Sequence, residues 1–378
     1  MRESGYSEAI RRLLRPEVGG LPAYDPGADP ETVLLDYGLE RIVKLSNNEN
    51  PYGISPLAAQ AIQQRLAQGL GRYPDPAGKD LCRALAQRHG IARERIILGN
   101  GSENILELLC QTFLNTGDQV VTQSPCFGLY EIFPLMMGAQ VLKVPLTESF
   151  ECDVEAWCKA LDRPVKLVFI SNPSNPVGTA FSKTELEAIV HACPDDCLLV
   201  IDEAYYEYAV SDPSYPDALK VLEAQERPWI VLRTFSKAYG LASLRVGYGI
   251  ASHIGIVEAL HRVRTPYNVN QLAQEAAVAA LEDNHHLQQS VALVSQERTR
   301  LTTTLRDEGY RVATSLANFL FIDTTVDASQ VVQALLREGV IVKAWREPGF
   351  ETFIRASVSL PAENDLFLQA LTRIQTPA

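Results

Sequence analysis

The chain has 378 residues, 46% of them hydrophobic and 21% charged, which suffices for two globular domains with a sizeable apolar core. Its net charge of −12 argues against a binder of nucleic acid or anionic membranes, because such proteins carry basic surfaces. The sequence has neither a membrane-spanning apolar stretch nor the apolar core of a secretory signal. Seven cysteines without a CxxC pair indicate reduced thiols in a cytoplasmic protein, with no metal site.

The first part of the chain combines helices with polar loops. Apolar periodicity predicts helices over residues 5–14, 56–70 and 80–89. A Pro/Gly-rich segment over 19–27 is expected to be extended, and the polar segments 45–53 and 72–76 are expected to be loops. Residues 1–45 are predicted to form an N-terminal arm that packs on another part of the protein and forms part of the small domain.

Strands and helices alternate through the middle of the chain. Apolar strands are predicted over residues 96–98, 119–121, 141–144, 166–170, 198–201 and 229–232. Helices are predicted over residues 105–114, 154–161 and 183–192. Continuous apolar strands that alternate with helices indicate a mostly parallel sheet buried on both faces, so we expect an α/β fold with a large domain over residues 46–270.

The last third of the chain has a different pattern. After a helix over 254–263 and a break over 264–270, a long helical stretch covers residues 271–308. Strands follow over 310–314, 319–323, 340–343 and 353–357, with helices over 328–338 and 363–374. Short strands alternating with helices indicate a smaller α+β C-terminal domain, which we assign to residues 271–378.

Polar residues recur where the strands of the large domain end. The five segments are Gly101-Ser102-Glu103, Phe127, Asn175, Asp202 with Tyr205, and Ser236-Lys237 with Arg245. In open parallel sheets ligands bind outside the carboxyl ends of the strands, so we expect these segments to converge on one crevice.

The segment around Lys237 suggests the chemistry of that crevice. Lys237 follows a buried strand and lies among hydroxyl, small and aromatic residues, a setting that lowers a lysine pKa and favours an imine-forming amine. Thr234, Ser236 and Arg245 suit a phosphate dianion, and the glycine turn before residue 102 opens a helix whose free N–H groups bind anions. Read alone, the segment is equally compatible with a buried strand that ends in a solvated lysine.

Pyridoxal 5′-phosphate would give each of these residues a role. Lys237 would hold its aldehyde as a Schiff base, and Asp202 would keep the pyridine nitrogen protonated. Asn175 and Tyr205 would donate to the phenolate oxygen, and Phe127 would stack on the ring. The phosphate would be surrounded by Gly101, Ser102, Glu103, Thr234, Ser236 and Arg245.

Arg355, near the end of a strand of the small domain, suits the bidentate binding of a substrate carboxylate. Taken singly, Phe127 is better interpreted as a core residue and Arg355 as a surface cation, and Asp202 is also compatible with a helix cap. Their joint occurrence at strand ends favours the site.

The chain resembles the fold type I, class II aminotransferases, and within them the histidinol-phosphate aminotransferase family. The motifs that carry the resemblance lie at residues 44–53, 72–75, 99–103, 172–178, 202–205, 233–240, 244–247 and 353–355. The resemblance implies a seven-stranded, mostly parallel sheet, pyridoxal 5′-phosphate as cofactor, and a homodimer with shared active sites. It also implies that Tyr73 reaches the cofactor phosphate of the other subunit, and that Tyr24 and Asn50 are among the substrate-binding residues.

One departure from the family pattern bears on the substrate. The family usually has an arginine that holds the substrate phosphate where this chain has Lys343, followed by Ala344, Trp345 and Arg346. Lysine is not interchangeable with a bidentate arginine. Either Arg346 substitutes for it, or the amino donor is an aromatic or other amino acid, for which Trp345 supplies apolar surface.

We therefore expect an aminotransferase acting on histidinol phosphate and 2-oxoglutarate in histidine biosynthesis, with Lys237, Asp202 and Tyr205 as catalytic residues. The alternatives are an aromatic amino acid aminotransferase and a decarboxylase of the threonine-phosphate type. A DNA-binding regulator built on such a domain is disfavoured by the acidic charge and by the roughly 20 residues that precede the matching region, too few for a DNA-binding domain.

Overall fold

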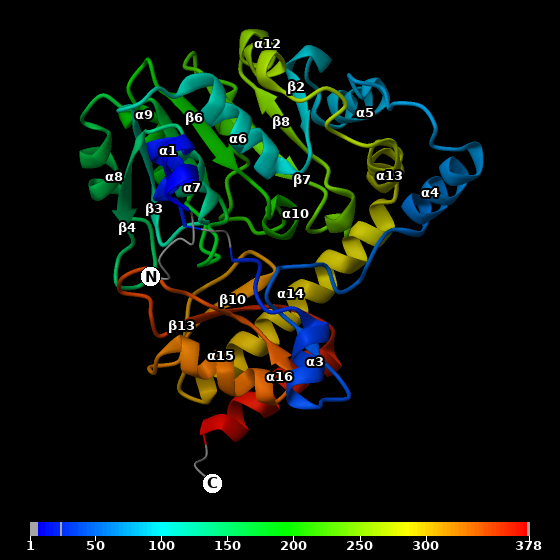
Figure 1. Cartoon of the computed structure of the whole chain (residues 1–378), viewed down its shortest axis with the longest axis vertical. Helices are drawn as coiled ribbons and strands as arrows, with labels where there is room; N and C mark the ends of the chain where they lie inside the picture. Colours follow the sequence, from blue (N-terminus) through cyan, green and yellow to red (C-terminus); the bar gives the residue numbers. More distant parts are fainter. Residues whose placement is uncertain (1–6, 23–24, 376–378) are drawn as a thin grey trace.

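The computed structural model describes residues 7–22 and 25–375. Figure 1 shows an upper unit built on a large sheet and a lower unit built on smaller sheets, with helix α14 (Asn284–Asp307) running from one to the other. In the part of the chain that is described, no helix combines the length and apolar character needed to cross a membrane.

The large sheet has seven strands in the order β2-β8-β7-β6-β5-β3-β4. Their bounds are β2 Ile96–Gly99, β3 Gln119–Ser124, β4 Gln140–Pro145, β5 Leu167–Ser171, β6 Leu198–Asp202, β7 Trp229–Thr234 and β8 Gly247–Ala251. β8 pairs antiparallel with both of its neighbours, and the other pairings are parallel. The predicted α/β fold with a mostly parallel sheet of seven strands is confirmed.

Helices cover both faces of this sheet because its strands are apolar on both sides. Along β5, Leu167 and Phe169 face one cluster of buried residues, whereas Val168 and Ile170 face another. The first cluster includes residues of α6 (Ser102–Phe113), α7 (Leu129–Met136) and α12 (Ile254–Val263). The second includes residues of α4 (Pro56–Gln68), α5 (Lys79–His89), α8 (Val154–Leu161), α9 (Lys183–Ala192), α11 (Ala218–Leu222) and α13 (Gln271–Glu282).

Strand β8 is absent from the strands predicted from the sequence. Glycine weakens a strand signal, and β8 contains two. The structure shows why Gly247 is needed, because a Cβ there would lie 2.4 Å from the backbone nitrogen of Ser102 at the start of α6. The strand therefore passes close to the N-terminus of that helix.

The predicted helical stretch 271–308 is helical and is divided into two helices, α13 and α14. The break falls at Asp283, whose carboxylate accepts the backbone N–H of His286 and the hydroxyl of Ser55. A side chain that caps a new helix offers the backbone an alternative to continuing the old one.

The lower unit contains a four-stranded antiparallel sheet, β12-β13-β10-β9, and a two-stranded parallel sheet, β1-β11. Their bounds are β1 Val43–Lys44, β9 Arg311–Val312, β10 Phe319–Asp323, β11 Val340–Ile341, β12 Lys343–Ala344 and β13 Phe353–Ser357. The predicted strand 340–343 is thus divided between two sheets. The helices of the lower unit are α3 (Pro30–Tyr37), α15 (Ala328–Arg337) and α16 (Pro361–Gln375). The sequence analysis did not predict α3.

Shorter elements complete the described chain: α1 (Glu8–Leu13), α2 (Pro16–Gly19), η1 (Arg93–Arg95), α10 (Tyr206–Ala209) and η2 (Ala242–Leu244). The division into an arm, a large domain and a small domain at residues 45 and 270 stays a prediction. Tyr205, Tyr208 and Ala238, which follow strands of the large sheet, lie in the apolar core of the lower unit. The carboxyl edge of the large sheet therefore faces the lower unit.

A buried ion pair joins the ends of β6 and β7. Arg233 donates to Glu203 from Nε at 2.9 Å and from Nη2 at 2.7 Å, and both side chains are buried. The guanidinium also lies 3.4 Å from the ring centroid of Tyr206, and Tyr215 donates to the other oxygen of Glu203. Each charge in this cluster is compensated, which a buried ion requires.

Replacing Arg233 by methionine should therefore destabilise the fold, because Glu203 would keep a buried and uncompensated charge. We expect a loss of about 3 to 5 kcal/mol, measured by urea unfolding of the ligand-free protein at fixed concentration. The exposed pair of Arg373 and Glu338 is the control, and Arg373→Met should cost less than about 1 kcal/mol. Equal losses for the two variants would contradict this account.

Candidate active site

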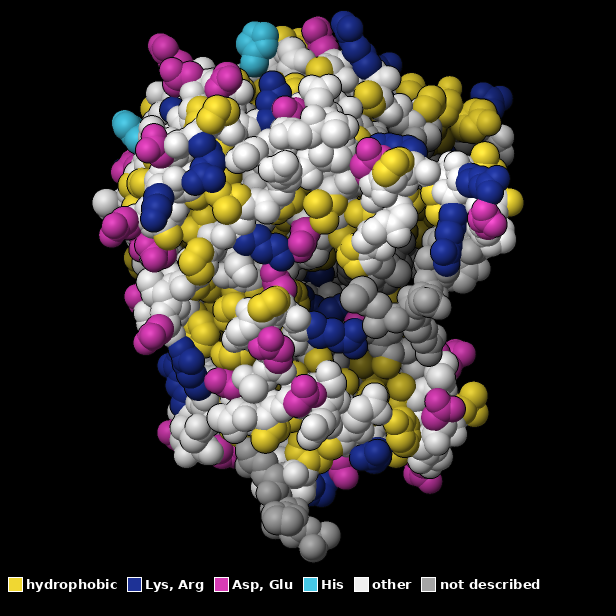
Figure 2. Space-filling view, turned by 60° about the vertical axis from the view of Figure 1, so that its left-hand side comes forward, with side chains coloured by type: hydrophobic (Ala, Val, Ile, Leu, Met, Phe, Trp, Pro, Cys, Tyr) yellow, Lys and Arg dark blue, Asp and Glu magenta, His cyan; other side chains and the backbone are white. Residues whose placement is uncertain are grey.

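A pocket of about 640 Å³ lies between the two units. Its lining includes most of the residues predicted from the sequence: Ser102, Glu103, Phe127, Asn175, Asp202, Tyr205, Thr234, Ser236, Lys237, Arg245, Lys343, Arg346 and Arg355. Figure 2 shows Lys and Arg side chains gathered around a hollow between the upper and lower parts of the molecule. The predicted convergence of strand ends on one crevice is thus present in the fold.

Lys237 lies in the pocket, in the loop that follows β7. Its Nζ donates to the backbone oxygen of Asn47 at 3.0 Å, and it lies 5.9 Å from the ring centroid of Tyr205. Burial, together with the positive charge of Arg355, lowers the pKa of Lys237 to about 8. A substantial fraction of this amine is therefore neutral and nucleophilic near neutral pH.

Asp202 ends β6 and is buried in the pocket wall. Burial raises the pKa of Asp202 to about 6, although its carboxylate accepts the hydroxyl of Tyr130 at 2.8 Å and the backbone N–H of Ala204 at 3.0 Å. A buried carboxylate with a raised pKa is costly unless a cationic group binds beside it. Asp202 therefore suits a ligand that presents a protonated nitrogen.

An anion cradle lies at the start of α6. The helix begins without a side-chain cap at Gly101, so the N–H groups of its first turn are available to a ligand. Arg245 extends across this turn, and a Cβ on Gly101 would lie 2.4 Å from its Nη2. Arg245 has φ of +57°, which is uncommon for a residue other than glycine, and its guanidinium contacts Ser236 and Glu103.

Arg355 connects the lower unit to the pocket. Its Nη1 donates to Asn175 Oδ1 and its Nη2 to the backbone oxygen of Ser46, both at 2.6 Å. Asn175 lies in the loop after β5. Nearby in the lining, the hydroxyl of Tyr205 accepts a hydrogen bond from the side-chain amide of Asn48 at 3.0 Å. The arginine is therefore held in a fixed orientation with its guanidinium in the pocket lining.

The remaining predicted residues lie in different places. Lys343 lines the pocket and donates to the backbone oxygen of Asp25, while Arg346 lines it with an exposed side chain. Asn50 lies outside the lining and donates to the backbone oxygen of Ala238, behind the lysine loop. Tyr73 is 81% exposed and stacks on Tyr267. Tyr24 lies outside the described residues.

Sequence reasoning missed several groups of the pocket. Tyr130, which donates to Asp202, lies three residues after Phe127, and the two rings pack edge to face with their centroids 5.6 Å apart. Asn48, bonded to Tyr205, had no signal beyond its polar loop. Glu131, Lys143 and Glu347 also line the pocket and were not predicted, because their contacts join distant parts of the chain.

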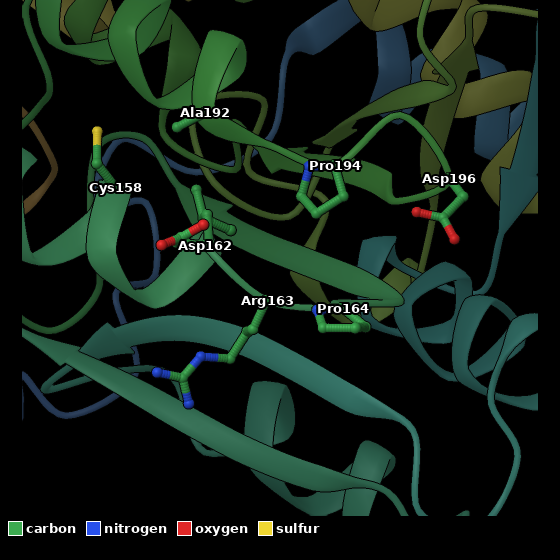
Figure 3. A pocket seen from close by; sticks show the side chains of 8 residues that line it. Cys158, Asp162, Arg163, Pro164, Ala192, Pro194 and Asp196 are labelled. Carbon is green, nitrogen blue, oxygen red and sulfur yellow. The ribbon is translucent and has the colours of Figure 1, made fainter.

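A second hollow lies at the opposite edge of the large sheet (Figure 3). Its lining includes Cys158, Asp162, Arg163 and Asp196 at the ends of α8 and α9, before β5 and β6 begin. The charged side chains around it are exposed, so nothing there resembles the buried groups of the main pocket.

Comparison with known proteins shows which family the chain belongs to. The family model described as aminotransferase class I and II matches residues 40–371. This chain belongs to the class I and II aminotransferase family. The aminotransferase is 43% identical over 364 residues to histidinol-phosphate aminotransferase 3 of Rhizobium meliloti, covering 96% of this chain and 98% of the relative. It is 44% identical over 362 residues to histidinol-phosphate aminotransferase 1 of Mesorhizobium japonicum, covering 96% and 98%.

A solved structure agrees with these sequences. The crystal structure of histidinol-phosphate aminotransferase from Sinorhizobium meliloti in complex with pyridoxal-5′-phosphate matches the aminotransferase with a TM-score of 0.87 and 29% identity, covering 98% of each chain. As an aminotransferase, the protein transfers amino groups between amino acids and oxo acids. The family assignment inferred from the sequence motifs is confirmed.

The buried charge of Asp202 should lower the stability of the ligand-free aminotransferase in a pH-dependent manner. The folded protein keeps the Asp202 proton up to about pH 6, whereas the unfolded chain releases it near pH 4, so the cost develops across this window and is complete above pH 6. Asp202→Asn removes the charge and should raise the melting temperature by roughly 2 to 4 °C at pH 7.5, with a smaller change at pH 4.5.

Thermal unfolding of the ligand-free protein at the two pH values measures this difference. Asp36→Asn, at an exposed position of α3, is the matched control and should show no such dependence on pH. A lower melting temperature for Asp202→Asn at pH 7.5 would contradict the inferred cost of the buried carboxylate.

Proposed function

We propose that this aminotransferase uses pyridoxal 5′-phosphate to transfer the amino group of histidinol phosphate to 2-oxoglutarate in histidine biosynthesis. Relatives of that name match nearly the whole chain at 43% and 44% identity, and the matching crystal structure of 29% identity contains the cofactor. The observation that carries the proposal is the presence of Lys237, Asp202 and an uncapped helix start beside Arg245 in one pocket.

The groups of the pocket fit the cofactor. A buried acid with a raised pKa suits the protonated ring nitrogen, since the positive charge would compensate the carboxylate. Gly101 adds no side chain of its own to the cradle, which leaves room for the guanidinium of Arg245. Ser102, Thr234, Ser236, Arg245 and the backbone N–H of Glu103 are donors that suit a phosphate. Phe127 in the lining offers an aromatic face, and Asn175 and Tyr205 offer donors for the phenolate oxygen.

The bound cofactor would supply an aldehyde for an amine and a ring that accepts electrons from the carbon losing its proton. Lys237 would hold this aldehyde, and its amine would take the α-proton of the substrate as general base and return a proton as general acid. Asp202 would keep the ring nitrogen protonated, and Tyr130 orients that carboxylate through its hydroxyl.

Three cations on the lower-unit side of the pocket suit anionic substrates. Arg355 is oriented by Asn175 and Ser46, which suits the bidentate binding of a phosphate or carboxylate. Lys343 and Arg346 add positive charge nearby. Burial lowers the pKa of Lys343, although it remains paired with the backbone at Asp25.

A second candidate substrate is an aromatic amino acid. The observation that favours it is Lys343 in the place of the family's arginine, together with Trp345, whose side chain lines the pocket and supplies apolar surface for a substrate ring. The fold, cofactor and proton transfers would be the same for both substrates.

We also propose a homodimer with shared active sites, located in the cytoplasm. Exposed apolar side chains gather on α4 and its flanks, namely Ile54, Leu57, Leu66 and Leu70, a pattern typical of an interface. Tyr73, 81% exposed next to this surface, is the residue expected to reach the phosphate in the partner's site. The seven free cysteines are in keeping with a reducing compartment.

Replacing Lys237 by alanine should abolish the visible absorbance of the lysine-bound cofactor and reduce turnover by more than about 10³-fold. Both effects are expected because no other amine lies in the same position. Lys159→Ala, on the exposed side of α8, is the control and should leave both properties unchanged. A Lys237→Ala protein that kept its absorbance and its activity would disprove the assignment.

The substrate is identified by half-reactions followed through the absorbance of the cofactor. Histidinol phosphate, phenylalanine, tyrosine, glutamate and O-phosphothreonine are each added to the loaded enzyme. We expect histidinol phosphate and glutamate to convert the cofactor to its amine form most efficiently. A preference for phenylalanine would replace the proposed donor, and carbon dioxide release from O-phosphothreonine would indicate a decarboxylase.

A further inference from the structure

An ion cluster forms part of the pocket wall away from Lys237. Lys143 on β4 lies with its Nζ 2.6 Å from Glu131 Oε2 of α7 and 2.8 Å from Glu347 Oε1 of the lower unit. Burial lowers the pKa of Lys143, but the hydrogen bonds that its ammonium donates to the two carboxylates outweigh burial, and the net shift of the pKa is upward. With two carboxylates beside it, this lysine is not available as a phosphate ligand, so its role lies elsewhere.

Glu347 has partners on both sides of the pocket. While Oε1 binds Lys143, Oε2 accepts the backbone N–H of Cys126 at 2.9 Å and the indole N–H of Trp345 at 2.8 Å. Lys143 and Cys126 belong to the upper unit, whereas Trp345 belongs to the same segment as Glu347. The Glu347 carboxylate therefore connects the 345–348 segment to the upper unit through hydrogen bonds, and it also orients the indole of Trp345.

Trp345 has a defined environment. Its ring packs edge-on against Phe321 with centroids 6.1 Å apart, and the guanidinium carbon of Arg355 lies 5.9 Å from the indole centroid. The remaining exposed part of the side chain, 9%, lines the pocket together with Ile132 and Pro348. The indole is therefore a fixed apolar surface next to the arginine that suits the substrate anion.

We propose that Glu347 is a positioning residue that, through Lys143 and Trp345, fixes the indole as one wall of the subsite for a planar ring on the amino donor. This inference rests on the proposed aminotransferase function and names the residues that select its donor. A ring-bearing donor anchored at Arg355 would lie along the indole and gain contact with it. Glutamate has no ring and would gain little from the same wall.

The test compares the two substrates of the reaction in variants of the loaded, full-length enzyme. Glu347→Ala removes the acceptor, Glu347→Gln keeps an acceptor oxygen for the indole N–H, and Trp345→Phe keeps a ring without the N–H. Glu338→Gln is the matched control, because it breaks a 2.7 Å ion pair with Arg373 on the lower unit, and neither residue lines the pocket.

Glu347→Ala should raise KM for histidinol phosphate about tenfold, the cost of a lost hydrogen bond to a charged group, with kcat little changed. Glutamate should keep its KM within about twofold, and the cofactor should bind as in the wild type. Glu347→Gln should restore part of the loss. Trp345→Phe should act in the same direction, and combining it with Glu347→Ala should add nothing further.

Several results would overturn the inference. Equal increases in KM for both substrates would indicate a purely structural role, and additive effects of the two changes would separate Glu347 from Trp345.

Should Glu347→Ala fail to fold, Glu347→Gln and Lys143→Met carry the same comparison. A wild type that prefers phenylalanine or tyrosine would replace the proposed donor, and the variants would then be compared on that ring-bearing substrate. Turnover of no ring-bearing donor would exclude the inference as well.

Discussion

The buried ion pair between Glu203 and Arg233 supports the rest of the site. It joins β6 and β7 one residue beyond Asp202 and one residue before Thr234, so it fixes the ends of the two strands that carry the acid and the lysine loop. The backbone N–H of Glu203 also bonds to Leu232 of the neighbouring strand. Because both side chains are buried, breaking the ion pair would cost a large part of the stability of the fold. The pair therefore fixes the relative position of these strand ends.

The pocket depends on both units. Tyr205 and Ala238 follow strands of the upper sheet and pack in the core of the lower unit. Conversely, Arg355 and Glu347 of the lower unit form hydrogen bonds with Asn175 and Cys126 of the upper unit. Groups that suit the cofactor thus come from the carboxyl edge of the large sheet, and groups that suit the substrate come mainly from the lower unit. With this separation, a substitution at a group that suits the substrate need not alter the groups that suit the cofactor.

The sequence predicted the parts of this arrangement that depend on local pattern. Apolar runs followed by polar residues identified the strands and the positions of Asp202, Lys237 and Arg245. The antiparallel β8 was missed because glycines weaken its strand pattern, and Gly247 is required by its close approach to the start of α6, a contact that local pattern does not show. Lys143 and Glu347 were missed for a related reason, since 204 residues separate them and charged residues alone usually indicate a solvated surface.

The reversed direction of β8 has a further consequence for how the site is built. Between parallel neighbours the chain must return across the sheet, which takes a dozen or more residues. Here β7 and β8 form a hairpin in which Thr234 pairs with Gly247, so the chain turns back at the ligand edge itself. Lys237 and Arg245 both lie in the loop that connects β7 to β8. The length of this connection sets the separation of the two groups, so a residue inserted or deleted between them would change that separation.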